Sequence, residues 1–231
     1  MTWGLAHPSP EHEPVLFSSE PTDTALERMH RTAAVGHPVG TGAAVPQLSF
    51  TTTVDARELL LFRSDLRSTL EGVVVCAAGR ALSTNPDVNV TVAESLGGAA
   101  IVPATSASVQ LLVLCDDGLR AGTVDAGERR SLLDVRDAVA ILVDGFRAGR
   151  FPRESEEAAL SVSTFALSGP VPSHTIATPV SAALAVGRLA GDGRTMQVQL
   201  SVDARVIEAD QASRLLRTIV RLLEHPYRRL L

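Results

Sequence analysis

Residues that could do acid–base or oxyanion chemistry gather in two short segments of this sequence, with two histidines in loops elsewhere. Hydroxyl groups can stabilise an oxyanion, and an imidazole can act as a general base. The segments are LSVSTFAL (160–167) and DARVIEA (203–209). The residues concerned are Ser161, Ser163, Thr164, Asp203, Arg205, Glu208, His37 and His174. Taken alone, a serine in a strand is usually an ordinary residue of the pleat, and a single loop histidine is usually solvated.

Composition excludes several other chemistries. The 231 residues include 21 basic ones, all of them arginine, so no lysine can form a Schiff base, anchor pyridoxal phosphate or complete a phosphate-binding loop. Aromatic residues make up 3% of the chain, which leaves few platforms for stacking single-stranded nucleic acid. The formal net charge of −5, without a basic block, argues against binding to duplex nucleic acid.

The cysteines and the apolar runs bear on the compartment. Cys76 and Cys115 lie in apolar runs, and we expect them to be free thiols in a reducing compartment. Cysteine and histidine show no metal-ligand spacing, so no metal site is predicted. The sequence shows neither a signal peptide nor an apolar run long enough to span a membrane. We therefore expect a cytoplasmic protein that contacts neither membrane nor nucleic acid.

The elements that would position these residues form a mixed α+β pattern. Residues 1–21 show no periodicity and are expected to be a flexible arm, whereas residues 22–231 form one domain. Asp116-Asp117-Gly118 and Gly191-Asp192-Gly193 predict tight turns between neighbouring strands. Alternating or β-branched segments predict strands at 47–54, 88–93, 99–103, 107–115, 119–124, 160–167, 182–189 and 195–202.

Apolar residues at helical spacing predict the helices. Asp55 is expected to cap a helix in which apolar residues recur from Leu59 to Leu70. A core helix ends at Asn85-Pro86, and His225-Pro226 stops the last helix. The other predicted helical segments are 25–34, 73–83, 132–147 and 210–223.

Several segments, taken in order, resemble one known family. They are LERM, VPQLSFTTTVDARELLLFRSDLR, NPDVNVTV, DDGLRAGTV, RRSLLDVRDAVAILVDGFRAGRF, LSVSTFALSG and LSVDARVIEADQASRLLRTIVRLLEHPYRRLL. The family is the catalytic domain of the dihydrolipoamide acyltransferases of 2-oxoacid dehydrogenase complexes, which shares its fold with chloramphenicol acetyltransferase. The resemblance covers about residues 22–231. It implies an α+β fold, a chloramphenicol acetyltransferase-like two-layer sandwich with a mixed sheet flanked by helices.

The resemblance fails at one residue on which the family's chemistry depends. The family carries a D-H-R-x-x-D-G motif, whose histidine takes a proton from the thiol or hydroxyl that attacks an acyl thioester. Here the segment reads Asp203-Ala204-Arg205-Val206-Ile207-Glu208-Ala209. The position of the base holds Ala204, which cannot carry a proton. Loss of a general base typically costs ~10²–10⁴-fold in rate.

Two explanations of Ala204 stay open. An engineered substitution would remove the base in order to trap a complex or test the mechanism. Glu208 and Ala209 also depart from the motif, however, and engineering of the base would not explain them. Three changes in one loop favour natural divergence from the ancestral reaction.

By resemblance, other positions take roles in the site. Ser163 falls where the family has the hydroxyl that stabilises the oxyanion of the tetrahedral intermediate. Glu208 falls on a carboxylate that is usually paired with an arginine, so a structural role is expected. The resemblance places Asp203 in the catalytic motif, and the candidates for substrate contact are Gln47, His174 and Arg205.

A basic cluster lies outside this motif. Arg147, Arg150 and Arg153 either form a solvated face, which is the interpretation we favour, or meet acidic groups such as a CoA phosphate.

The resemblance also implies partners and a choice of functions. Family members form homotrimers with active sites between subunits, hold no covalently bound cofactor and use a CoA or carrier thioester as co-substrate. Only about twenty residues precede the domain, so a free-standing relative in specialised metabolism is expected. Three functions stay open: acyl transfer to a small-molecule hydroxyl, with activity lost or altered at Ala204; a non-catalytic trimeric scaffold or binding protein; and a repurposed pocket that cyclises a polyketide-like intermediate or eliminates from it.

Overall fold

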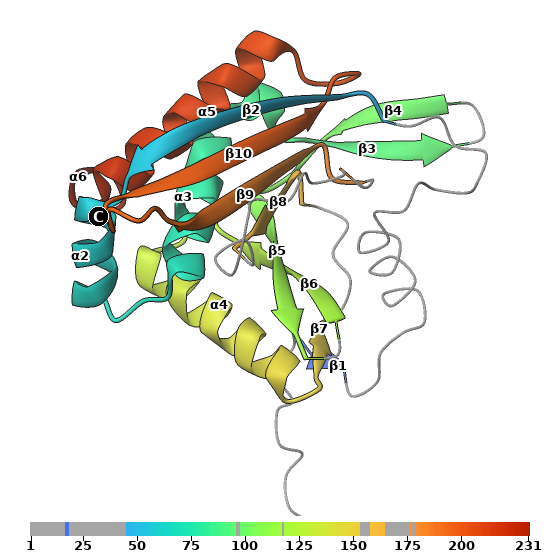
Figure 1. Ribbon diagram of the computed structural model, residues 1–231. Helices are drawn as coiled ribbons and strands as arrows, with labels where there is room; N and C mark the ends of the chain where they lie inside the picture. Colours follow the sequence, from blue (N-terminus) through green and yellow to red (C-terminus); the bar gives the residue numbers. More distant parts are fainter. Residues whose placement is uncertain are drawn as a thin grey trace, which may run out of the picture.

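The computed structural model describes residues 17–18, 45–95, 98–116, 118–152, 158–164, 176 and 179–231. The predicted helix at 25–34 and most of the predicted N-terminal arm lie outside these residues. Figure 1 shows the strands and the longer helices as separate layers. The strands are β1 (Phe17–Ser18), β2 (Gln47–Asp55), β3 (Val90–Ser95), β4 (Gly98–Pro103), β5 (Ser108–Cys115), β6 (Gly118–Asp125), β7 (Phe151–Pro152), β8 (Leu160–Ser163), β9 (Ala182–Leu189) and β10 (Thr195–Asp203). The helices are α2 (Arg57–Asp65), α3 (Leu70–Thr84), the 3₁₀ turn η1 (Pro86–Val88), α4 (Leu132–Arg147), α5 (Ala209–Glu224) and α6 (Pro226–Arg229).

Six strands form one mixed sheet in the order β2-β10-β9-β8-β5-β6. Its two central pairs, β9–β8 and β8–β5, are parallel, and the other pairs are antiparallel. Strands β3 and β4 form a separate hairpin, and β1 pairs with β7. The predicted α+β fold, a mixed sheet flanked by helices, is therefore confirmed.

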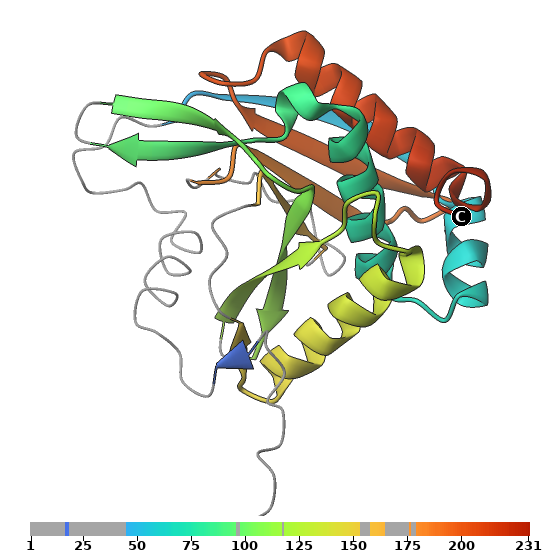
Figure 2. The same cartoon turned by 180° about the vertical axis from the view of Figure 1, so that it is seen from behind.

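Helices α3, α4 and α5 cover one face of the sheet, as Figure 2 shows from behind. Alternate residues of the strands point into this layer, and in β10 they include Val198, Leu200 and Val202, all at 0% exposure. Helix α3 is buried nearly all round, which explains why its sequence VVVCAAG has no polar face. The opposite face of the sheet carries small or polar residues, such as Ser163, Ala185 and Ser201.

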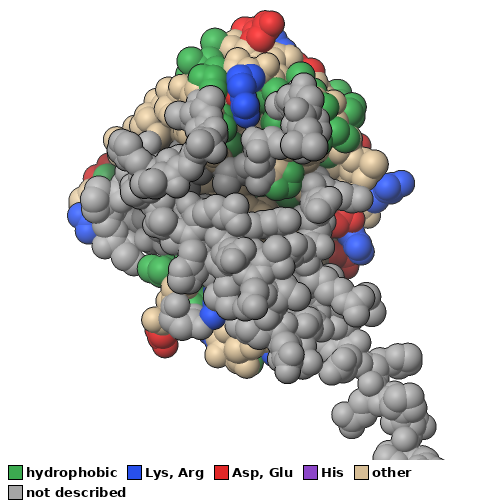
Figure 3. Space-filling model, turned by 90° about the vertical axis from the view of Figure 1, so that its right-hand side faces the viewer, with side chains coloured by type: hydrophobic (Ala, Val, Ile, Leu, Met, Phe, Trp, Pro, Cys, Tyr) green, Lys and Arg blue, Asp and Glu red, His purple; other side chains and the backbone are tan. Residues whose placement is uncertain are grey.

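The hairpin β3–β4 projects from the sheet (Figure 1). Its residues Ile101 and Val102 are 54% and 43% exposed, so this hairpin presents apolar surface. Figure 3 views the molecule from the side toward which the hairpin points, and hydrophobic side chains there lie among charged ones. Among the described residues, no helix is both long and apolar enough to cross a membrane.

The two helices predicted after β2 are present, but the boundary between them lies earlier than predicted. Apolar spacing continues from Leu59 to Leu70, but α2 ends at Asp65, and Arg67 takes a positive φ of 49° that no helix can continue. The side chain of Thr69 then accepts a hydrogen bond from the backbone N–H of Gly72 and caps α3. The prediction that Asp55 caps α2 is also wrong in detail, because the N-cap residue is Ala56; Asp55 accepts a bond from the backbone N–H of Arg57.

Close packing explains a glycine in the middle of α3. A Cβ atom built on Gly79 would lie 2.2 Å from the carbonyl oxygen of Ala126 and 2.4 Å from its Cβ. Ala126 follows β6, so α3 can approach this end of the sheet only where it has no side chain.

The short helix α6 is fastened to α2. The Tyr227 ring packs edge-on against Phe62 at 4.9 Å, and its hydroxyl donates a hydrogen bond to the Asp65 carboxylate. This bond holds the phenol in its neutral form and raises the pKa of Tyr227 from 10.0 to about 12.

The Tyr227–Asp65 contact predicts an unusual titration. Because the folded-state pKa lies above the unfolded value of 10.0, the contact stabilises the fold below that pH, and its contribution is lost as pH rises to about 12. Tyr227 is the only tyrosine, so the ultraviolet absorbance of tyrosinate reports it directly. We expect a midpoint near 12, and a midpoint closer to 10.0 in Asp65→Ala. An equal midpoint in both proteins would contradict the assignment.

Candidate functional site

The loop that follows β10 is held by a buried carboxylate. Asp203, the last residue of β10, is 1% exposed. The Arg205 guanidinium donates to both of its oxygens, with Nη2–Oδ2 at 2.7 Å and Nε–Oδ1 at 3.0 Å. The carbonyl of Asp203 also accepts from the backbone N–H of Ile207 at 3.0 Å, which closes a tight turn. Thus the Asp and Arg of the motif serve as a frame for the residue between them.

Ala204 sits in this frame with an exposed side chain. Its backbone N–H donates to the carbonyl of Pro46 at 2.8 Å, which ties the loop to the start of β2. Gln47, the first residue of β2, pairs with Asp203 across the sheet and therefore lies beside the loop. The methyl group of Ala204 can neither accept nor donate a proton, so the residue that this loop holds in place cannot act as an acid or a base.

Glu208 begins helix α5 as its N-cap residue. Its backbone N–H donates to the Gln211 side chain at 2.8 Å, and Gln211 in turn donates to Asp87. Within the part of the chain that the structure describes, Glu208 forms no ion pair, so the expected arginine partner is not found there. The bond to Gln211 uses the Glu208 backbone and not its carboxylate, so the structural role of this side chain stays a prediction.

Ser163 lies at the end of β8, between β5 and β9, and is 1% exposed. The hydroxyl of the next residue, Thr164, donates a hydrogen bond to the Glu71 carboxylate at 3.0 Å. The predicted strand at 160–167 ends earlier than expected, at Ser163, and residues 165–167 lie outside the described residues. Glu71 was not predicted, because 93 residues separate it from Thr164 and no local pattern marks the contact.

Ser163 and Ala204 do not meet within one chain. Ser163 pairs with Ala185, which pairs with Gln199 of β10, and Ala204 comes five residues after Gln199. A strand rises about 3.3 Å per residue, so the two positions are roughly 16 Å apart along the sheet, in addition to two strand spacings across it. The two side chains therefore cannot contact each other within one chain.

The remaining candidates supply no substitute base among the described residues. His37, His174 and Arg153 lie outside them. The one described histidine, His225, is at the far end of α5, where its Nδ1 lies 3.2 Å from the Glu58 carboxylate. Arg147 forms an exposed pair with Asp144. No group of three or more His, Cys, Asp or Glu side chains in the described ranges could hold a metal ion.

Comparison with known proteins identifies the family. The sequence matches the family described as 2-oxoacid dehydrogenases acyltransferase (catalytic domain) over residues 30–231. The chain belongs to this family. It is 25% identical, over 255 aligned positions, to the mouse (Mus musculus) mitochondrial pyruvate dehydrogenase protein X component, with 98% of this chain and 50% of the relative covered. The chain thus spans about half the length of the curated relative it matches.

Solved structures show the same acyltransferase fold. The dihydrolipoamide acetyltransferase of Azotobacter vinelandii superposes with a TM-score of 0.71 at 21% identity, covering 96% of this chain and 95% of that one. A chloramphenicol acetyltransferase superposes with a TM-score of 0.53 at 14% identity, covering 77% and 88%. The expected chloramphenicol acetyltransferase-like architecture is confirmed by these likenesses.

The Asp203–Arg205 pair of this acyltransferase-family loop predicts a local stability effect. Asp203→Asn removes the charge from a carboxylate that is 1% exposed, while the Arg205 side chain remains 34% exposed and can partly regain water. We expect a loss of about 1–2 kcal/mol in the free energy of unfolding, measured by urea titration. Asp144→Asn is the control, since its pair with Arg147 is 71% and 73% exposed and should contribute nothing measurable. Equal effects of the two substitutions would show that the loop frame contributes no more than a surface pair.

Proposed function

We propose that this chain is a non-catalytic member of the acyltransferase family, which acts as an assembling and binding domain in a homotrimer. The observation that supports the proposal is Ala204. The Asp203–Arg205 pair and the backbone bond to Pro46 hold this residue in place, but its side chain is only a methyl group. The loop keeps its turn and its ion pair, so its architecture is preserved while the proton acceptor is missing. A chain that keeps the acyltransferase fold but has lost the general base is what selection for assembly or binding, and not for catalysis, would produce.

The separation of Ser163 and Ala204 supports the oligomer. Ala204 is exposed at one end of the sheet, and Ser163 is buried roughly 16 Å further along the strands and two strands across the sheet. In the related Azotobacter vinelandii enzyme, a serine, a histidine and an asparagine have been studied for their part in the catalytic mechanism. From the sequence resemblance, we assign the role of that serine to Ser163 and the position of that histidine to Ala204. A site shared between neighbouring subunits accounts for both positions.

The proposal is tested by two measurements on the natural chain. Sedimentation velocity should give the mass of a trimer. An assay that follows acyl transfer from acetyl-CoA to small thiols and hydroxyls should give the uncatalysed rate. A monomer at micromolar concentration, or turnover that Ser163→Ala abolishes, would each overturn the proposal.

A second candidate is acyl transfer from a CoA or carrier thioester to a small-molecule hydroxyl. The burial of Ser163 favours it, because a hydroxyl shielded from water is suited to stabilising an oxyanion. Glu208 is the remaining ionisable group of the motif apart from the Asp203–Arg205 pair, and it would have to take the proton. In this case Glu208→Gln should lower the turnover of the natural chain at least tenfold, whereas the first proposal predicts no turnover to lower.

A further inference from the structure

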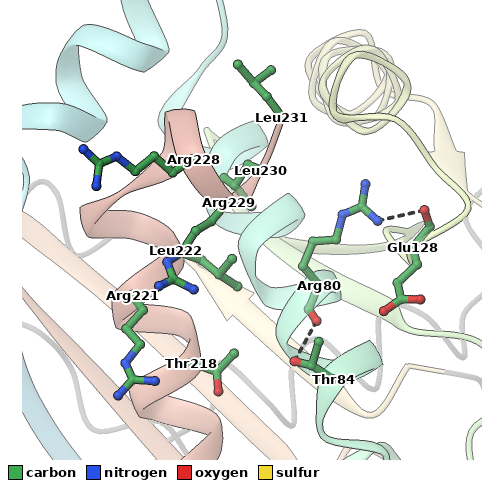
Figure 4. Close-up of a pocket in the computed structure, with 10 residues that line it drawn as sticks. All are labelled: Arg80, Thr84, Glu128, Thr218, Arg221, Leu222, Arg228, Arg229, Leu230 and Leu231. Atoms are coloured by element: carbon green, nitrogen blue, oxygen red, sulfur yellow. Dashed lines mark hydrogen bonds between the residues drawn. The ribbon is translucent and has the colours of Figure 1, made fainter.

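A basic hollow lies between the C-terminal half of α3 and the end of α5 with α6, as the close-up in Figure 4 shows. Its volume is about 600 Å³. Four arginines line it: Arg80 from α3, Arg221 from α5, and Arg228 and Arg229 from α6. Glu128 is the one acidic side chain among its lining residues. Leu231, the last residue of the sequence, also lines the hollow and brings its terminal carboxylate, so four guanidinium groups face two carboxylates. The hollow is thus net positive on a chain whose net charge is −5.

None of these four arginines forms an ion pair with a carboxylate of the described residues. Arg80 is fixed by backbone carbonyls, with its Nη1 2.7 Å from the oxygen of Glu128 and its Nη2 3.0 Å from that of Arg130 (Figure 4 draws the first bond). Arg221, Arg228 and Arg229 form no ion pair with any described residue. Some arginines elsewhere do form such pairs, for example Arg57 with Asp55, Arg130 with Asp125 and Arg214 with Asp87. Others, such as Arg63 and Arg188, are also unpaired within the described residues, so what distinguishes the hollow is that four arginines line one cavity.

Gathering like charges around one hollow costs free energy, and a bound anion offsets that cost. The guanidinium group is suited to this task because its planar fork matches the oxygens of phosphates and carboxylates. The volume falls within the range of small-molecule sites. Arginines line both the α3 wall and the α5–α6 wall of the hollow. A ligand with a single anionic group would compensate the charge of one wall only, so a ligand with two such groups fits better.

The hollow is separate from the acyltransferase-family loop. Ala209, where α5 begins, and Arg221 are twelve residues apart, which is roughly 18 Å along a helix. A ligand in the hollow would therefore not touch Ala204 or its frame.

We propose that this hollow binds a small organic anion that carries at least two phosphate or carboxylate groups. One group would bind Arg229 and Arg221 on the α5–α6 wall, and the other would approach Arg80 on the α3 wall. The inference does not depend on the function proposed above, since it uses none of the residues of that site.

The test is isothermal titration calorimetry of the full chain with inorganic pyrophosphate and, separately, with citrate. The two probes distinguish a preference for phosphate from one for carboxylate. We expect saturable binding of at least one probe with one site per chain. In Arg221→Ala/Arg229→Ala, affinity should fall by at least about tenfold, because two charge-assisted contacts are lost.

The matched control is Arg63→Ala/Arg188→Ala, which removes the same charge from exposed residues of α2 and β9 that do not line the hollow. Its affinity should stay within about twofold of the natural chain. All four side chains are exposed, so melting temperatures should be equal and should verify folding. Absence of saturable binding of both probes, or equal weakening by the two double substitutions, would overturn the proposal.

Discussion

Ala204→His is expected to raise the rate of acyl transfer from acetyl-CoA to a small thiol acceptor by about 10²-fold over the natural chain. A general base contributes typically ~10²–10⁴-fold, and the lower end applies because Glu208 and Ala209 also depart from the family motif. The frame that would orient the imidazole is present: the Asp203–Arg205 pair closes the turn, and the Ala204 amide is tied to Pro46. The rate of CoA release, followed by chromatography, gives the measurement.

Two further variants decide whether the gain comes from proton transfer. Ala204→Gln fills similar space without a basic nitrogen and should leave the rate at background. Ser163→Ala, added to Ala204→His, should lower the gained rate by about 10²-fold if Ser163 supports the oxyanion. A rate for Ala204→His equal to that of Ala204→Gln would show that the loss of activity does not reside in the single missing imidazole.

Gly79→Ala is expected to be the most destabilising single methyl addition in the described core. The new Cβ would lie 2.2 Å from a backbone carbonyl oxygen, and backbone cannot move aside as a flexible side chain can. We expect a loss of about 3 kcal/mol in the free energy of unfolding, at the upper end for overpacked cores. In a chain of this size, that corresponds to a fall of about 6–12 °C in melting temperature, measured by calorimetry.

Gly191→Ala is the control for this substitution. A Cβ at Gly191 would meet no atom within 4 Å, so its effect should be close to zero. A melting temperature for Gly79→Ala within about 2 °C of the natural chain would mean that α3 can shift away from Ala126 at little cost.

The elements that local pattern predicted well are those with their own end signals. Helix α4 matches the predicted 132–147 because Ser131 caps it and Gly149, with φ of 71°, ends it. Helix α5 similarly stops before Pro226. The end of α2 was predicted too late, after Leu70 instead of at Asp65, because the spacing of Leu66 and Leu70 continues the helical pattern. The signals that separate the two helices are the positive φ of Arg67 and the N-cap at Thr69, and neither changes the spacing of apolar residues.

The residues of the site were predictable from the family motif, whereas their arrangement was not. Asp203 and Arg205 are two residues apart, so their pairing is local. The distance between Ser163 and Ala204 depends on the order β8-β9-β10 and on the register of these strands, which are properties of the folded chain. The same holds for the bond between Glu71 and Thr164 and for the hollow between α3 and α6.

The distance between Ser163 and Ala204 also has a genetic consequence. When two halves of a site come from different copies of a chain, a defect in one half can be complemented by a copy with a defect in the other. The natural chain, which has Ser163 but no base, and the double variant Ser163→Ala/Ala204→His would each be inactive alone. If the two proteins are unfolded together and refolded, they would form mixed oligomers. Some subunit interfaces in these oligomers would contain both a serine at position 163 and an imidazole at position 204. Activity that appears only on mixing would reveal a shared site without any structure of the assembly.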